Sequence, residues 1–141
     1  MKIAEMWPPE ALAHTIEAAL GLVRQTEDAA LVVSDDPNGR PRRIIIATER
    51  GLAIADVEWE SKTHGRLPAP TMELSFALWR EVRTILAVNM PAVGDPKVSL
   101  TVNTPATGDI VTKSPQGRSA RQPFDEMLSI LLEKSAGVSR S

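Results

Sequence analysis

The chain has 141 residues, 43% of them hydrophobic and 24% charged, which is typical of one folded domain and too apolar for a disordered segment. Sixteen basic residues against 18 acidic ones leave a formal net charge of −2, so no general positive field draws the chain to nucleic acid or to an anionic membrane. The absence of cysteine excludes disulfides, thiolate nucleophiles and cysteine-ligated zinc.

The N-terminal segment predicts an amphipathic helix over residues 9–26. Pro8, Pro9 and Glu10 suit a first turn, because proline lacks the amide proton that would stay unpaired there. Apolar residues then recur on one helical face, at Leu12, Ile16, Ala19, Leu20 and Val23. Acidic residues and His14 interrupt any signal-peptide core, and no run approaches the ~18 apolar residues of a membrane span. We expect a cytoplasmic protein.

Residues 29–113 change to short β-rich runs separated by turn residues, the pattern of an antiparallel sheet. Seven strands are expected, in the order AALVVS, RRIIIAT, LAIADVEW, ELSFALW, VRTILAVN, KVSLTVNT and DIVTK. Alternation in VSLTV predicts that Val98, Leu100 and Val102 face a core. The second and third strands are joined through Gly51, which can take a positive φ at little cost. Four residues of these strands are expected core: Ile44, Ile46, Ile54 and Val57.

The C-terminal segment predicts a second amphipathic helix. Ser119 or Gln122 is the expected cap, with Pro123 in the first turn and Gly137 as the stop. The apolar stripe of this helix comprises Phe124, Met127, Leu128 and Leu131. Residues 137–141 are expected to form a mobile tail.

Two short stretches add a family resemblance. ATERGLAI, with Thr48, Arg50 and Leu52, is similar to a hairpin of bacterial pleckstrin-homology-like and GRAM-type domains. LWREVRTI resembles a later segment of those domains, at Trp79, Glu81, Val82 and Ile85. The order of one helix, seven strands and a closing helix also matches the pleckstrin-homology superfold.

The resemblance implies an α+β fold. A bent antiparallel seven-stranded sheet or partly open barrel would span residues 29–136, closed by the C-terminal helix, with residues 1–28 as an additional helical extension packed on the domain. The alternative is a small α+β pocket fold of the nuclear-transport-factor type. Such folds usually finish on strands, whereas this chain is expected to finish on a helix.

Two basic loops are candidates for anion binding. By the resemblance, the first strand connection is where lipid-binding pleckstrin-homology domains hold phosphate-binding residues, and guanidinium groups suit phosphate because each offers two parallel hydrogen bonds. Asp35 and Asp36 would repel an anion, so we favour an exposed salt-bridging loop and expect at most weak binding by loops 35–43 and 61–70. The candidate residues are Arg40, Arg42, Arg43, Lys62, His64 and Arg66.

No catalytic motif is visible. His14 and His64 have no second histidine or clustered carboxylates at ligand spacing, and the sequence contains no glycine-rich phosphate loop, nucleophile elbow or His-Glu-x-x-His helix. Asp35, Asp36 and Asp56 are interpreted as turn and strand-end residues. We therefore expect no enzyme activity, no metal and no cofactor.

The leading hypothesis is a non-catalytic binding module that recognises a protein partner, or a second copy of itself, through an exposed sheet edge and a helical face. Met6 and Trp7 are candidate contact residues, because methionine and aromatic residues are enriched at interfaces. The alternative is a small-molecule or enzymatic pocket around Phe76, Trp79 and Leu100. Neither nucleic acid nor strong membrane binding is expected.

Overall fold

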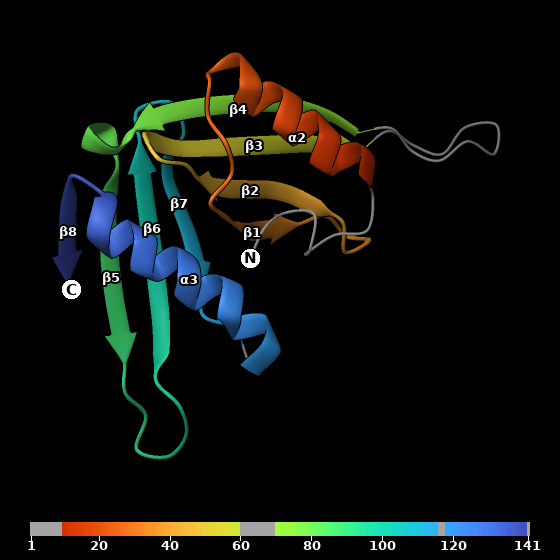
Figure 1. Cartoon of the computed structure of the whole chain (residues 1–141). Coiled ribbons are helices and arrows are strands. Elements are labelled where there is room, and N and C mark those ends of the chain that lie inside the picture. Colours follow the sequence, from red (N-terminus) through yellow and green to blue (C-terminus); the bar gives the residue numbers. More distant parts are fainter. Residues whose placement is uncertain (1–9, 60–69, 116–117, 141) are drawn as a thin grey trace.

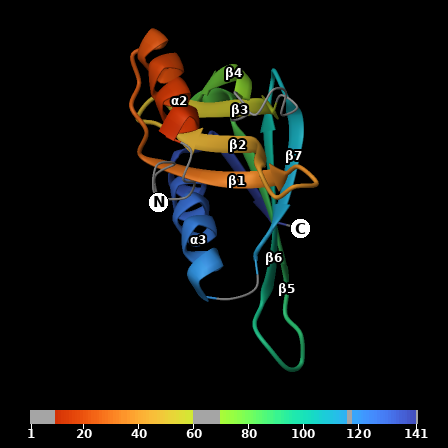
Figure 2. The same cartoon turned by 90° about the vertical axis from the view of Figure 1, so that its right-hand side faces the viewer.

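The computed structural model describes residues 10–59, 70–115 and 118–140. Within them the chain has an α+β fold with two four-stranded sheets and two α-helices (Figures 1 and 2). The elements are α2 (Glu10–Leu22), β1 (Ala29–Asp35), β2 (Pro41–Ala47), β3 (Gly51–Trp59), β4 (Pro70–Leu78), the 3₁₀-helix η1 (Trp79–Glu81), β5 (Arg83–Asn89), β6 (Lys97–Thr104), β7 (Gly108–Lys113), α3 (Arg118–Lys134) and β8 (Gly137–Arg140).

The seven strands expected over residues 29–113 are present, but they do not form the single seven-stranded sheet that was one of the two predicted arrangements. The first sheet has the order β1-β2-β3-β4 and the second β7-β6-β5-β8. The break falls at η1, because within the described ranges β4 pairs with β3 alone, while β5 pairs with β6 and β8. In Figure 1 the strands of the first sheet run across those of the second.

The first sheet is buried on both faces. One face lies against the second sheet and α3, in a group of residues that we call the inner cluster, which includes Ile45 and Ile54. The other face lies against α2, in the outer cluster, which includes Ile44 and Ile46. Because successive strand residues point to opposite faces, a strand covered on both sides is apolar throughout, which explains the run Ile44–Ile46.

α3 lies beside β1 and over the second sheet, and its apolar side chains belong to the inner cluster (Figures 1 and 2). Its side chains Phe124, Met127 and Leu131 are fully buried there, and burial of each such side chain stabilises the fold by about 1.5–3 kcal/mol. The expected apolar stripe is therefore confirmed. The helix begins earlier than expected, at Arg118, so Pro123 lies inside the helix and not in its first turn.

α2 packs on the opposite face of the first sheet. Leu12, Ile16 and Leu20 are its buried residues. The expected end at residue 26 is wrong: the helix ends at Leu22, Arg24 takes a left-handed backbone conformation (φ 56°), and the Gln25 amide donates to the Leu20 carbonyl. This is the hydrogen-bond pattern of a Schellman motif, usually built on glycine.

The C-terminal segment and Gly51 also differ from what the sequence suggested. Gly137–Arg140, placed in a mobile tail by the sequence, forms β8 and pairs in parallel with β5. Gly51 does not have a positive φ. Glycine is required there for a different reason: a Cβ atom at this position would overlap the Ala77 carbonyl oxygen and lie 2.7 Å from Cζ of Phe76.

Candidate functional site

The β1–β2 loop is closed by one ion pair. Nε of Arg40 lies 2.8 Å from Oδ2 of Asp36, and Oδ1 of the same carboxylate accepts hydrogen bonds from the amides of Asn38 and Arg40. The Arg40 guanidinium also lies over the Trp59 ring, 5.3 Å from its centroid. The indole N–H of Trp59 donates to the Pro41 carbonyl at 2.7 Å. Arg40 therefore has a structural role within its own loop.

The two adjacent aspartates of this loop have pKa shifts in opposite directions. Burial raises the pKa of Asp35 above its ordinary value of 3.8, and the charge of Asp36 raises it further. Burial also disfavours the charged form of Asp36, but hydrogen bonds from the Arg40 backbone and side chain and from the Asn38 backbone outweigh it, so the pKa of Asp36 is lowered. The lowered pKa of Asp36 thus arises from hydrogen bonds inside the loop, whereas the raised pKa of Asp35 arises first from burial.

Arg43 is paired as well. Its Nε lies 2.6 Å from Oδ1 of Asp56 on the neighbouring strand. Arg42 and Arg43 line a depression of about 630 Å³ whose wall also includes three carboxylates, from Asp56, Glu58 and Glu73. Because the carboxylates outnumber the two guanidinium groups, the local charge does not favour an anion.

The remaining candidate residues are not among those that the structure describes. Lys62, His64 and Arg66 lie outside the described residues, as do Met6 and Trp7. The structure thus brings Arg42 and Arg43 to one depression and directs Arg40 toward Trp59.

The residues expected to surround a pocket are separated. Trp79 and Leu100 belong to the inner cluster, and Phe76 packs against the outer cluster on the other face of the first sheet. A single pocket therefore cannot be lined by these three side chains.

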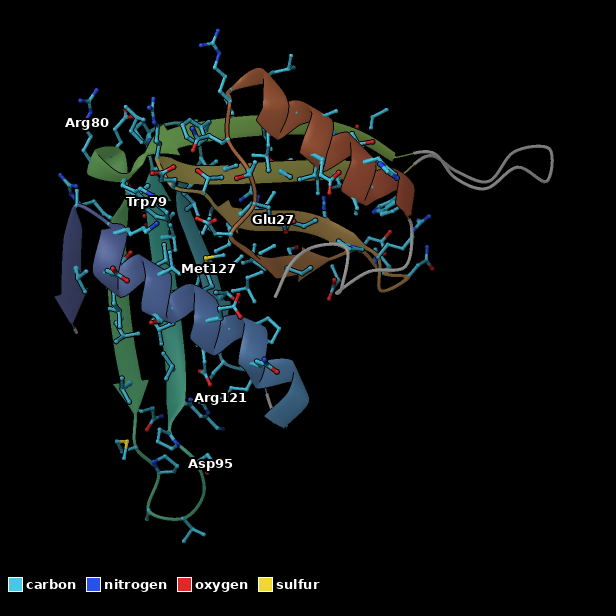
Figure 3. All side chains as sticks on the ribbon, in the orientation of Figure 1. Glu27, Trp79, Arg80, Asp95, Arg121 and Met127 are labelled. Atoms are coloured by element: carbon cyan, nitrogen blue, oxygen red, sulfur yellow. The ribbon has the colours of Figure 1, made fainter. Side chains whose placement is uncertain are left out.

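A second groove, of about 790 Å³, lies where the loop end of the β5–β6 hairpin meets the start of α3. Figure 3 labels a residue from each side, Asp95 on the hairpin and Arg121 on α3. Arg121 joins the two sides, since its Nη1 donates to the Pro96 carbonyl at 3.3 Å. The lining residues are Ala87, Val88, Asn89, Asp95, Pro96, Lys97, Val98, Ser99, Lys113, Ser114, Pro115 and Arg121.

The groove combines positive charge with apolar surface. Lys97, Lys113 and Arg121 outnumber the single carboxylate of Asp95, and alanine, valine and proline side chains supply the apolar part. Nε of Arg121 also lies 3.3 Å from Oδ1 of Asp125, an exposed pair on α3. An extended segment that carries both apolar and acidic side chains matches this lining.

The tip of this hairpin, residues 88–97, exposes large apolar side chains. Val88 is 49% exposed, Met90 70% and Val93 91%. Figure 1 shows that the hairpin extends beyond the rest of the described chain. In the sequence, residues 90–96 stand between two expected strands and carry no recognised motif. The available signal was the presence of methionine and valine where a solvent-exposed turn usually has polar residues.

Other kinds of site are not found in the described part of the chain. It contains no group of three or more histidine, aspartate or glutamate side chains able to hold a metal ion. None of its helices has the length and apolar character needed to cross a bilayer. Comparisons of the chain with family models, with curated proteins and with solved structures gave no match.

Proposed function

We propose that this protein is a non-catalytic binding module that recognises a protein partner at the β5–β6 hairpin and the adjacent groove. The observation that carries the proposal is the concentration of exposed apolar side chains on one hairpin. Of the nine large hydrophobic side chains exposed within the described residues, three are Val88, Met90 and Val93. Exposed apolar groups gathered beside polar ones mark interaction surfaces more often than scattered ones do.

The occupant is an extended partner segment with apolar and acidic side chains. Apolar residues of the segment would cover Met90 and Val93, each worth about 1.5–3 kcal/mol if fully buried. Its carboxylates would face Lys97, Lys113 and Arg121, which speeds association and selects against basic segments. The helical part of the surface is the start of α3, since the apolar face of α2 is already covered by the first sheet.

Binding rather than catalysis is supported by the position of the two aspartates with shifted pKa values. Catalytic groups usually combine a shifted pKa with a position in a cleft. Asp35, whose pKa is raised, and Asp36, whose pKa is lowered, line neither groove.

A pleckstrin-homology-like relationship remains part of the proposal. It is supported by the order of elements: a four-strand antiparallel meander, a three-strand antiparallel meander and a helix whose apolar side chains belong to the inner cluster. On this interpretation α2 and β8 are additions to the domain.

A small amphiphilic anion is the second candidate ligand. The groove volume of about 790 Å³ lies within the range of small-molecule sites, ~300–1,000 Å³. Lys97 and Lys113 would bind the anionic group of this ligand. The apolar side chains that line the groove would contact its hydrocarbon part.

Selection from a random peptide library on the immobilised full chain tests the proposal. We expect enrichment of peptides that combine apolar and acidic residues. A selected peptide, labelled for fluorescence polarisation, should lose at least tenfold in affinity with the Met90→Ser, Val93→Ser double variant and with Lys97→Glu, Lys113→Glu. Leu22→Ser is the matched control, because Leu22 is a similarly exposed apolar residue, at the end of α2.

Three outcomes would contradict the proposal. These are enrichment of basic peptides, absence of any enrichment, and equal loss of binding in the Leu22→Ser control. Displacement of the bound peptide by a medium-chain carboxylate, with no peptide selected more tightly than that carboxylate, would instead favour the small amphiphile.

A further inference from the structure

β4 forms an open edge of the first sheet. It is nine residues long and, among the residues that the structure describes, pairs only with β3. The edge at the other side of this sheet, β1, lies against α3 and β7. A long edge strand offers backbone donors and acceptors to another strand, and proteins normally cover or interrupt such an edge.

The direction of each β4 amide follows from the antiparallel ladder. The Trp79 amide donates to the Arg50 carbonyl at 3.2 Å, so this residue pair is hydrogen-bonded. Hydrogen-bonded and non-hydrogen-bonded pairs alternate along an antiparallel ladder. With the register Gly51↔Leu78, the backbone groups of Thr71, Glu73, Ser75 and Ala77 point to β3, and those of Met72, Leu74, Phe76 and Leu78 point outward.

Two observations agree with this assignment. Pro70, which has no amide proton, occupies an outward position, and the outward amide of Leu78 is satisfied by Oε1 of Glu81 at 3.1 Å. The outward amides of Met72, Leu74 and Phe76 have no backbone partner among the described residues. Their side chains are half-buried and pack against the outer cluster.

Charge and hydrogen bonding together favour one register in which two copies of β4 can pair. An antiparallel pair centred on Glu73 would place two carboxylates opposite each other, which is destabilising. A pair centred on Ser75 would match Met72 with Leu78, whose amide is already used by Glu81. A pair centred on Leu74 has neither defect: Glu73 faces the partner's Ser75, and Met72 faces the partner's Phe76.

We infer that the β4 edge is a self-association surface, at which two copies of the chain pair antiparallel about Leu74 and join their first sheets. The three outward residues of each strand would then form hydrogen-bonded pairs with those of the other. Met72 and Phe76 would meet across the strands, a favourable thioether–aromatic contact. This inference is independent of the hairpin groove, which lies on the second sheet.

Substitution of Ser75 tests the register. Ser75 and Glu73 lie on the same face of β4, so Ser75→Glu creates two like-charge pairs in the dimer, and Ser75→Lys creates two opposite-charge pairs. By sedimentation velocity of the full chain, we expect wild type to show a concentration-dependent dimer. The dimer Kd of the two variants should differ by about tenfold, with the lysine variant the tighter. The two substitutions are matched controls, since both replace serine with a long charged side chain.

Crosslinking gives a second test that does not depend on affinity. The chain has no cysteine, so each variant carries one thiol. Leu74→Cys places the two thiols opposite each other at a Cα separation of about 5.5 Å, within the ~4.4–6.8 Å range of disulfides. Met72→Cys is the control, because its two copies are offset by four residues, ~13 Å along the strands. Mild oxidation should crosslink the two copies of the first variant and leave those of the second without a disulfide.

The outcomes separate this inference from the proposed function. A strictly monomeric wild type up to millimolar concentration, equal Kd values for Ser75→Glu and Ser75→Lys, or equal crosslinking of the two cysteine variants would each overturn it. The Met90→Ser, Val93→Ser variant should dimerise like wild type. Loss of dimer in that variant alone would place self-association on the hairpin and overturn the β4 assignment.

Discussion

The indole N–H of Trp79 donates to the carbonyl oxygen of Thr48 at 3.0 Å and also to that of Glu49 at 3.2 Å. Trp79 begins η1, where the chain passes from the first sheet to the second, and Thr48 begins the β2–β3 turn. The Thr48 hydroxyl is itself buried and donates to the Gly51 carbonyl at 2.8 Å. One side chain thus fixes the junction of the two sheets to a turn much earlier in the chain.

Replacing Trp79 with phenylalanine tests this junction. The variant loses the indole donor, leaves the Thr48 carbonyl without that partner and leaves a gap in the inner cluster, so we expect the free energy of unfolding to fall by about 2–4 kcal/mol. Trp59→Phe is the control. It also removes an indole hydrogen bond, to the Pro41 carbonyl, but the Trp59 side chain is only half-buried. Urea unfolding measures both variants. If Trp79→Phe lowered the free energy of unfolding by no more than Trp59→Phe does, the role assigned to Trp79 would be wrong.

Two glycines should respond to alanine in opposite directions. At Gly51 a Cβ atom would overlap the Ala77 carbonyl and separate β3 from β4, so Gly51→Ala should lower the free energy of unfolding by about 1–3 kcal/mol or more. Gly21 lies within α2 with no atom within 4 Å of an added Cβ. There alanine should stabilise the protein by about 0.5–1 kcal/mol, because glycine costs more entropy in a helix. Thermal unfolding of both variants gives the signs.

The strands were predictable where the alternation was local. In β6, the residues Val98, Leu100 and Val102 are buried as their spacing predicts, and the strand bounds agree with the sequence. The division into two sheets was not predictable, because it depends on which strands pair across η1. The run Ile44–Ile46 shows only that β2 is buried on both faces, and does not show what covers each face.

The candidate sites were predictable to a smaller extent. The Arg40–Asp36 pair follows from sequence spacing, whereas the Arg43–Asp56 pair depends on strand register. The role of Gly51 depends on the approach of Ala77 from another strand. The apolar residues Met90 and Val93 were visible in the sequence, but their exposure follows from a hairpin that extends past the core.

Acid titration should separate the two aspartates of the β1–β2 loop. The pKa of Asp36 is lowered in the folded state, so its ionised form stabilises the fold above pH ~3.8, and this contribution is lost as the pH falls through the lower folded-state pKa. The pKa of Asp35 is raised, so its ionised form opposes folding, and this cost is relieved as the pH falls through the raised pKa toward 3.8.

Asparagine variants give the measurement. Asp36→Asn should be less stable than wild type at pH 7, and Asp35→Asn more stable. Both differences should shrink toward zero below the pH range set by the two shifted pKa values. Urea unfolding at a series of pH values from 7 down to the acid limit of folding gives the two curves. Variants that change stability in the same direction at pH 7 would show that the opposite pKa shifts are wrong.

The last prediction concerns anionic membranes. Arg40 is paired with Asp36 and Arg43 with Asp56, and the depression beside Arg42 includes three carboxylates. Near a membrane surface each free basic residue contributes roughly 1 kcal/mol, which these acids and the net charge of −2 offset. We therefore expect no strong co-sedimentation with phosphoinositide-containing vesicles at ~0.15 M salt, where exposed charges are screened within ~8 Å. Clear pelleting that disappears in the Arg40→Ala, Arg42→Ala double variant, but persists in the exposed control Arg80→Ala, would make this a membrane-binding domain.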